Sequence, residues 1–311
     1  MGTTIRIGTR ESQLAVWQAT QVQQLLAQQA AVAELVFIKS EGDIDLQTPL
    51  YEIGVQGIFT RSLDIALLNK QIDLAVHSMK DVPTQLPAGI IQAAVLKRGS
   101  YKDLLVYKGE NPAEDNWLFA NTHPLLIASS SIRRKAQWLH RFPHHSITNL
   151  RGNVNTRLQK LADSNWHGAI FAAAGLERIG LRPAASIELD WMLPAPAQGA
   201  IMIVCREDDQ ATWEACQAFN DADTAACTAI EREFLRTLLG GCSTPISALA
   251  TITEGQLHFS GNILSPDGQE KVEVIRTVPI SNAPTLGIEA ANEVLTKGGL
   301  QIADRIRHAG N

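Results

Sequence analysis

Short apolar runs alternate with longer amphipathic segments at the start of the chain, and this alternation limits the possible folds more than any other feature. Residues 5–7 read as a strand, and a helix follows after Ser12, a good N-cap. Further apolar runs at 35–38 and 72–76 flank a second helix near 63–68. Strands and helices in this order form a parallel sheet covered by helices, so we predict an α/β lobe.

The same alternation restarts after a stretch at 108–124 that is rich in turn-forming residues. Strands and helices are predicted at 125–128 (strand), 132–141 (helix), 153–161 (helix) and 169–172 (strand). A proline-rich passage at 193–197 follows and leads into an apolar strand at 200–204. Proline among small residues suits a crossing between lobes, so strand 200–204 is predicted to return to the first lobe.

The last ninety residues have a different pattern. A helix that includes residues 230–238 stops at a pair of glycines, and a closing helix is predicted over 284–306. Between them, alternating segments at 246–252, 257–264 and 272–278 predict an antiparallel sheet, with Pro266-Asp267-Gly268 as a hairpin turn. We therefore predict three domains: 1–97 with 196–216, then 98–195, and a small α+β domain at 217–311.

Composition excludes several classes of protein. The chain has 311 residues, 45% of them hydrophobic and 19% charged, which excludes a disordered or coiled-coil protein. The net charge of −5 argues against nonspecific binding of nucleic acid. No secretory signal and no membrane-spanning run are expected. None of the four cysteines forms a C-x-x-C pair, so no metal site is predicted, and free thiols suit the cytoplasm.

Positive charge is concentrated in one window. Residues 129–160 contain seven basic residues and no Asp or Glu. Arg133 and Arg134 fall at a predicted helix start, where the helix dipole favours an anion rather than a cation. Because arginine pairs with carboxylates through two parallel hydrogen bonds, a small molecule with several carboxylates is the favoured partner. The alternatives are a solvated basic face, or arginines paired with acidic residues from elsewhere in the chain.

Two further positions could carry chemistry. Asp81 follows the predicted strand at 72–76, at the end of a parallel strand where such sheets place their sites. It could stabilise a developing positive charge, or it could simply bond its own backbone in a turn. Cys242 follows two glycines and could act as a nucleophile, or it could be an unreactive loop thiol. His77 is expected to be a buried, hydrogen-bonded residue rather than a base.

Seven stretches follow one another in the order found in a known family. They are Thr9-Arg10-Glu11-Ser12, Val76-His77-Ser78-Met79-Lys80-Asp81-Val82-Pro83, Ser129-Ser130-Ser131-Ile132-Arg133-Arg134, Leu150-Arg151-Gly152-Asn153-Val154-Asn155-Thr156-Arg157-Leu158, Ala173-Ala174-Gly175-Leu176-Glu177-Arg178-Ile179-Gly180, Pro194-Ala195-Pro196-Ala197-Gln198-Gly199-Ala200 and Gly240-Gly241-Cys242. Together they resemble the porphobilinogen deaminases, also called hydroxymethylbilane synthases. The stretches at 78–83 and 150–158 are the most specific, and the last fifty residues carry little of the pattern.

The resemblance implies a fold and an activity. The fold is two periplasmic-binding-protein-like lobes, each a doubly wound mixed sheet, plus a small α+β domain with a three-stranded antiparallel sheet. The activity is that of a transferase in tetrapyrrole and haem biosynthesis. It condenses four porphobilinogen molecules head to tail, with loss of ammonia, into linear hydroxymethylbilane on a dipyrromethane cofactor made from substrate. A cytoplasmic monomer without nucleic-acid or membrane partners is implied.

The resemblance also assigns roles to residues. Asp81 is the implied catalytic carboxylate, and Cys242 holds the cofactor through a thioether. The other implied cofactor-binding residues are Asp81 itself, Lys80, Ser130, Ser131, Arg133, Arg134 and Arg151. The implied substrate-binding residues are Arg10, Ser12, Arg151, Arg157 and Gln198.

Three positions depart from the family pattern. Gln56 replaces a lysine, Glu52 stands where some members have a basic residue, and Glu41 replaces a neutral or basic residue. Less positive charge near a polyanion could weaken its binding. A competing hypothesis is a noncatalytic, two-lobed anion-binding protein, which would have no use for a nucleophile at Cys242.

Overall fold

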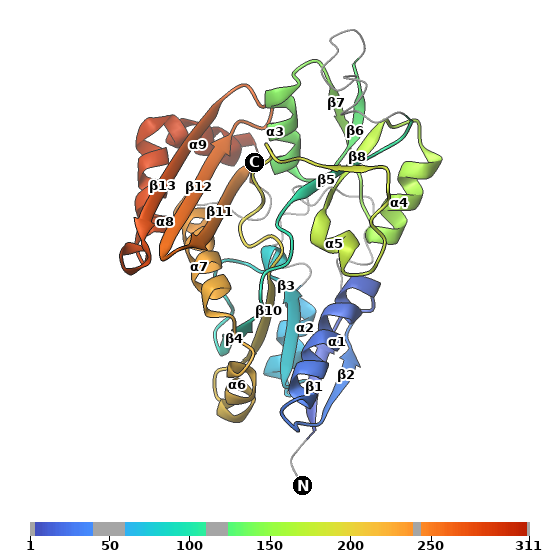
Figure 1. Cartoon of the computed structure of the whole chain (residues 1–311), viewed down its shortest axis with the longest axis vertical. Helices are drawn as coiled ribbons and strands as arrows, with labels where there is room; N and C mark the ends of the chain where they lie inside the picture. The colour runs from blue at the N-terminus through green and yellow to red at the C-terminus, as the bar shows by residue number, and fades with distance from the viewer. Residues whose placement is uncertain (1–3, 40–59, 110–123, 239–243, 310–311) are drawn as a thin grey trace. The chain divides into compact units, whose positions relative to one another are not determined.

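The structure is a computed structural model of the whole chain, and it describes residues 4–39, 60–109, 124–238 and 244–309 (Figure 1). Contacts between Cα atoms divide the chain into two compact units. Among the described residues, the first unit holds those up to Gly99 together with Gln198–Ala226, and the second holds Ser100–Ala197 and the residues from Cys227 onward. The predicted division into three domains stays a prediction.

The first unit is built on a five-stranded sheet of mixed orientation. Its strand order is β2 (Ala33–Phe37), β1 (Ile5–Thr9), β3 (Leu74–Ser78), β10 (Ile201–Arg206) and β4 (Ile90–Val95). Strands β2, β1 and β3 are parallel, while β10 runs antiparallel between β3 and β4. The prediction that the apolar strand after the proline-rich passage returns to the first lobe is therefore confirmed.

Helices cover both faces of this sheet. Helices α1 (Gln13–Ala27) and α6 (Gln210–Gln217) share one apolar cluster with Ile7 of β1. The next residue, Gly8, points to the opposite face, because successive strand residues alternate, and it meets Leu63 of α2 (Arg61–Leu68). A Cβ at Gly8 would lie 2.2 Å from the Ile72 side chain, so a larger residue would push this layer away. The unit is a doubly wound α/β lobe.

The first sheet of the second unit has a similar plan. Its strand order is β7 (Ser146–Thr148), β6 (Leu126–Ala128), β8 (Gly168–Ala172), β5 (Asp103–Tyr107) and β9 (Ser186–Glu188). Strands β7, β6 and β8 are parallel, and β5 is antiparallel to both of its neighbours. Helix α3 (Ile132–Arg141) packs on one face, and α4 (Val154–Asp163) and α5 (Ala173–Glu177) pack on the other.

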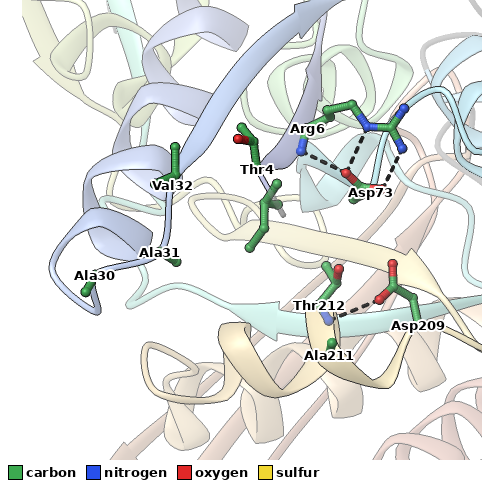
Figure 2. Close-up of a pocket in the computed structure, with 10 residues that line it drawn as sticks. Thr4, Arg6, Ala30, Ala31, Val32, Asp73, Asp209, Ala211 and Thr212 are labelled. Carbon is green, nitrogen blue, oxygen red and sulfur yellow. Dashed lines mark hydrogen bonds and ion pairs between the residues drawn. The ribbon is translucent and has the colours of Figure 1, made fainter. Parts of the chain in front are cut away.

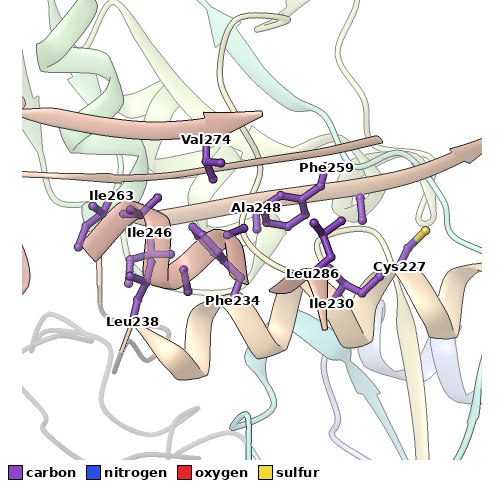
Figure 3. Packing of buried hydrophobic residues seen from close by; sticks show 14 of the residues in the cluster. Cys227, Ile230, Phe234, Leu238, Ile246, Ala248, Phe259, Ile263, Val274 and Leu286 are labelled. Atoms are coloured by element: carbon purple, nitrogen blue, oxygen red, sulfur yellow. The ribbon is translucent and has the colours of Figure 1, made fainter. Parts of the chain in front are cut away.

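The C-terminal part of the second unit is an α+β layer. Strands β11 (Ile246–Thr253), β12 (Gln256–Leu264) and β13 (Lys271–Pro279) form the predicted antiparallel sheet, with the predicted turn at 266–268. Its apolar face packs on α7 (Ala222–Thr237) and α8 (Leu286–Val294), and Figure 3 shows Phe234 of α7 against Phe259 of β12. Together with the two mixed sheets, this layer confirms the predicted fold class.

The closing helix differs from the prediction. A single helix was expected over 284–306, but α8 ends at Val294, and α9 (Leu300–Ala309) begins after a π-helical turn at Leu295–Gly299. The break lies at Gly298, whose φ of 111° is open to glycine and strained for other residues. The helical periodicity of the sequence continues across this point, which is why one helix was predicted.

Candidate active site

The predicted site residues of the first unit gather at one edge of its sheet. Parallel strands β1 and β3 end there, and antiparallel β10 begins there, so the segments that join these ends share one edge. This placement brings together Arg10 and Ser12 after β1, Lys80 and Asp81 after β3, and Gln198 just before β10.

Asp81 is the last residue of a single 3-10 turn, Met79–Asp81, which continues directly from β3. Buried Met79 anchors this turn, and the N–H of Val82 closes it by donating to the Met79 carbonyl at 3.1 Å. The Asp81 side chain is half-buried and makes no hydrogen bond or ion pair with any residue in the described part of the chain. The alternative in which Asp81 bonds its own backbone is therefore not what the structure contains.

The neighbours of Asp81 are held in place. Lys80 Nζ donates to Gln198 Oε1 at 3.2 Å, and Gln198 is only 1% exposed. The carbonyl of Gln198 accepts a hydrogen bond from Arg98 Nε at 2.8 Å. Lys80 is thereby tied to the segment that leads into β10, which explains how Gln198, distant in sequence, belongs to this edge.

His77 and Ser12 have structural roles at this edge. His77 is buried, as predicted, and burial together with the charge of Arg10 lowers its pKa to about 4, so the imidazole is neutral. The hydrogen bond expected for it is not found among the described residues. Ser12 caps α1, accepting the N–H of Ala15 at 3.4 Å.

In the second unit, two loops leave the carboxyl ends of the parallel strands β6 and β7. Ser131 caps α3 by accepting the N–H of Arg134 at 3.4 Å. Ser130 Oγ donates to Asn149 Oδ1 at 2.5 Å and accepts the N–H of Leu150 at 2.8 Å. Ser130 therefore fastens the loop that carries the paired arginines to the loop that carries Arg151.

The second loop turns sharply before α4. Arg151 is buried to 4% exposure, and its carbonyl accepts a hydrogen bond from Lys160 Nζ at 3.1 Å. Arg157 lies on the first turns of α4, and its Nε donates to the Gly152 carbonyl at 2.7 Å. Four predicted basic residues thus stand at one sheet edge, with Arg133 and Arg134 on α3 and with Arg151 and Arg157 at α4.

Arg133 and Arg134 already have one anionic partner, Asp103. Arg133 Nη2 donates to Asp103 Oδ2 at 2.8 Å, and Arg134 Nη2 donates to Oδ1 at 2.7 Å. Asp103 is fully buried at the start of β5, and antiparallel β5 begins where β8 ends. For Arg133 and Arg134, the alternative given by the sequence is therefore confirmed: they pair with an acidic residue from elsewhere in the chain, Asp103. Sequence reasoning missed Asp103, although a carboxylate that opens a buried strand signals such a partner.

The pairing leaves this cluster incomplete. Two guanidinium groups share a single carboxylate, so one positive charge in a buried setting has no counter-charge from Asp103. Arg133 Nε is buried and has no hydrogen-bond partner, and burial lowers the pKa of Arg133. A carboxylate-bearing ligand would supply what the cluster lacks, since buried polar groups normally find partners. The residues present therefore fit a polycarboxylate cofactor.

Arg178 was not singled out from the sequence. It caps the C-terminal end of α5, which follows β8 at the same sheet edge, and burial lowers its pKa to about 10. It lies in one of the seven family-like stretches, at 173–180. Arg178 is half-buried at this edge, and its lowered pKa makes it a candidate for the same tests as the four predicted arginines.

Cys242 and the departures Gln56, Glu52 and Glu41 lie outside the described residues. Cys205, Cys216 and Cys227 are buried, and burial raises the pKa of Cys205 to about 11 and of Cys216 to about 12. These two thiols are therefore protonated and unreactive near neutral pH. In the part of the chain that the structure describes, no cluster of His, Cys, Asp and Glu could hold a metal ion, and no helix is long and apolar enough to cross a membrane.

A surface cavity of about 620 Å³ lies at the other end of the first sheet (Figure 2). Arg6 at the start of β1 and Asp73 just before β3 line it, and Arg6 Nη2 binds Asp73 Oδ1 at 2.8 Å. Asp209 caps α6 there by accepting the N–H of Thr212 at 3.1 Å. None of the predicted site residues lines this cavity, and the charges named here are already paired or hydrogen-bonded within the unit.

The fold and the two sheet edges define a class of protein. It is an α/β protein in which the strand ends carry Asp81, a carboxylate without a hydrogen-bond or ion-pair partner among the described residues, in the first unit and a set of arginines in the second. Residues 5–214 match the family described as porphobilinogen deaminase, dipyromethane cofactor binding domain, and residues 225–296 match its C-terminal domain. The chain belongs to the porphobilinogen deaminase family.

Relatives named porphobilinogen deaminase extend over nearly the whole chain. The protein of Syntrophotalea carbinolica is 41% identical over 97% of this chain and 94% of its own length. That of Pelobacter propionicus is 38% identical over 97% of both chains. The chloroplastic protein of Oryza sativa is 40% identical over 97% of this chain and 86% of its own. Among solved structures, the methionine-binding protein MetQ has a TM-score of 0.45 at 14% identity, covering 74% of this chain and 94% of that chain.

Proposed function

We propose that this chain condenses four porphobilinogen molecules, with loss of ammonia, into linear hydroxymethylbilane on a dipyrromethane primer. The observation that carries the proposal is the carboxylate of Asp81 at the carboxyl end of β3, which no described residue engages, in a chain of this family. A two-lobed anion-binding protein without catalysis would not require such a group. No observation favours that second function.

Asp81 acts on the charge that develops in the substrate. The C–N bond of the aminomethyl group breaks, its electron pair leaves with ammonia, and positive charge spreads over the pyrrole ring and its N–H. A carboxylate that accepts this N–H stabilises the cation where it forms. The same carboxylate stabilises the positive charge that arises when the new C–C bond forms, before the joined carbon loses its proton.

The basic side chains at the two sheet edges would bind the acetate and propionate groups that every pyrrole carries. Arg133, Arg134, Arg151 and Lys80 would hold the cofactor's carboxylates, and Cys242 would hold its carbon skeleton through a thioether. The bound cofactor supplies the pyrrole carbon to which the first substrate is joined. Arg10, Arg157 and Gln198 would bind and orient the incoming substrate, with Ser12, Ser130 and Ser131 fixing the loops that carry these groups.

The decisive experiment measures the intact mass of the purified protein. We expect a covalent adduct of two pyrrole units, which is absent from the Cys242→Ala variant. Incubation of unmodified wild-type chain with porphobilinogen should add the same mass. A wild-type chain that remains unmodified after that incubation would refute the proposed function.

The setting of the enzyme belongs to the same proposal. We infer a cytoplasmic monomer whose partner is porphobilinogen, with no nucleic-acid or membrane partner. The free, buried thiols of Cys205 and Cys216 are what a reducing compartment allows. Size-exclusion chromatography with light scattering tests the monomer, with a dimer mass as the contrary result.

A further inference from the structure

Helix α3 has a further buried polar side chain, Gln137, one turn beyond the paired arginines. Gln137 is 6% exposed, and both the nitrogen and the oxygen of its amide are hydrogen-bonded. Its Nε2 donates to the Leu193 carbonyl at 2.9 Å and to Ser247 Oγ at 3.0 Å, while its Oε1 accepts the N–H of Leu193 at 2.9 Å. Two donors and an acceptor on one buried side chain form a fixed junction, because breaking any bond leaves a buried polar group unpaired.

The junction joins the arginine-bearing lobe to the C-terminal sheet. Ser247 is the second residue of β11 and is fully buried. The neighbouring N–H of Ala248 donates to the Pro194 carbonyl at 3.2 Å. Arg133 Nη1 donates to the Leu193 carbonyl at 2.7 Å, beside the Gln137 bond. The segment at Leu193 and Pro194 is therefore held between α3 and β11, and Arg133 shares its anchor with Gln137.

A second contact fixes the same helix to the β12–β13 turn. His140 Nδ1 lies 2.7 Å from the Gly268 carbonyl oxygen. At Gly268 the φ is +76°, and a Cβ there would lie 2.5 Å from the His140 nitrogen and 2.6 Å from the Ala136 carbonyl oxygen. The turn thus touches the backbone of α3 directly, an approach that only glycine allows. Two contacts about one helical turn apart therefore join α3 to the C-terminal sheet.

This arrangement matters because of what each side carries. Helix α3 carries Arg133 and Arg134, which have one carboxylate between them. In the sequence, Cys242 precedes Ser247 by five residues. A fixed start of β11 therefore fixes one end of the short segment that bears the cysteine, relative to the guanidinium groups proposed to bind the cofactor.

We propose that Gln137 is a positioning residue that fixes the start of β11 to α3, so that a primer on Cys242 meets the arginines in one register. This inference rests on the proposed function. With each addition, the carboxylates of the growing pyrrole chain must move from one arginine to the next. A loosened junction would misplace these carboxylates relative to the arginines. Small misplacements of bound groups cost large factors in rate.

The test compares Ser247→Ala, Gln137→Leu and their combination with a matched control, Ser260→Ala. Ser260 lies on the same face of the sheet in β12, is half-buried, and makes no side-chain hydrogen bond among the described residues. Three measurements are made on each purified protein: the melting temperature, the kcat and KM for porphobilinogen, and the adduct masses after a limiting dose of substrate.

We expect Ser247→Ala and Gln137→Leu to carry the two-pyrrole adduct but to accumulate partly extended adducts, with kcat lowered about tenfold and KM within about twofold of wild type. The double variant should be no worse than Gln137→Leu, since both changes break one junction. Ser260→Ala should match wild type. If Gln137→Leu does not fold, Ser247→Ala alone decides.

The contrary result is a fall in melting temperature with wild-type kcat and a wild-type distribution of adduct masses. Gln137 would then stabilise the fold without positioning the primer, and the inference would be overturned. Failure of the proposed function is seen separately, because it would appear as an unmodified wild-type chain.

Discussion

Arg134 binds Asp103 through two nitrogens, with Nε at 3.0 Å and Nη2 at 2.7 Å from the same oxygen, Oδ1. Arg134 Nη1 also donates to the Ile170 carbonyl at 3.0 Å, so this guanidinium is held by β5 and β8 at once. Arg133 binds the other oxygen of Asp103. One buried carboxylate thus sets the orientation of both arginines.

Removal of that carboxylate should destabilise the protein strongly. In Asp103→Ala, two buried guanidinium groups lose their counter-charge, and breaking a buried pair of this kind costs about 3–5 kcal/mol. The matched control is Asp190→Ala, which breaks the ion pair with Lys102 in the same lobe, where the Asp190 side chain is 76% exposed. That change should cost at most about 1 kcal/mol. Urea unfolding measures both, and equal losses would show that Asp103 is no more than a surface-type partner.

Asp81 is expected to matter for turnover and not for folding. Asp81→Asn keeps the shape of a half-buried side chain that has no partner among the described residues, so the melting temperature and the adduct should be retained. Loss of the charge that faces a developing cation should lower kcat by roughly 100-fold or more. Asp208→Asn, at a side chain that is 70% exposed in the same unit, serves as the control. Turnover of Asp81→Asn within about threefold of wild type would remove Asp81 from the mechanism.

Arg157 should affect the addition of substrate units to the adduct more than it affects stability. Its side chain is half-buried on α4, so Arg157→Leu should lower the melting temperature by only a few degrees. Loss of a charge-assisted pair with a carboxylate should reduce adduct formation or its extension about tenfold. Lys135→Leu removes an exposed charge from the same acid-free window and should leave both unchanged. Equal effects of the two variants on the adduct would mean that the window acts only through its overall charge.

Local signals in the sequence predicted the elements that carry the site. Helix α3 was predicted at its observed bounds, because a polar turn of three serines at 129–131 directly precedes it, and Ser131 proves to be its N-cap. The strand predicted before Asp81 is confirmed as parallel β3, so Asp81 lies at the carboxyl end of a parallel strand, and its role in a site stays a prediction. Both inferences depend on neighbours in sequence, which a single chain displays.

Contacts between residues that are distant in the sequence could not be predicted from it. Asp103 is distant in sequence from the arginines that it binds, and only the antiparallel placement of β5 beside β8 brings it to them. The Gln137–Ser247 bond spans 110 residues in the same way. The break at Gly298-Gly299, by contrast, was visible as a glycine pair, but the apolar periodicity on both sides favoured one continuous helix.

Buried Asp64 on α2 should make stability depend on pH. Burial raises the pKa of this carboxyl to about 6, despite a hydrogen bond from Thr60 that lowers it. A carboxyl whose pKa is raised in the folded state favours folding while it is protonated, at low pH. That contribution is lost as the pH rises from about 4 through about 6, and the ionised group then penalises the folded state.

Asp64→Asn removes the charge that burial disfavours. We expect the variant to be more stable than wild type at pH 7.5, by at most about 3 kcal/mol for a pKa shift of about two units. The difference should vanish near pH 4, where the wild-type carboxyl is protonated in the folded state. His77 and His145, whose pKa values burial lowers to about 4, change stability in the opposite direction. They are present in both proteins, so the difference between the two urea midpoints isolates Asp64. A difference that stays constant from pH 4 to pH 8 would show that Asp64 is ionised throughout, and that its burial carries no electrostatic cost.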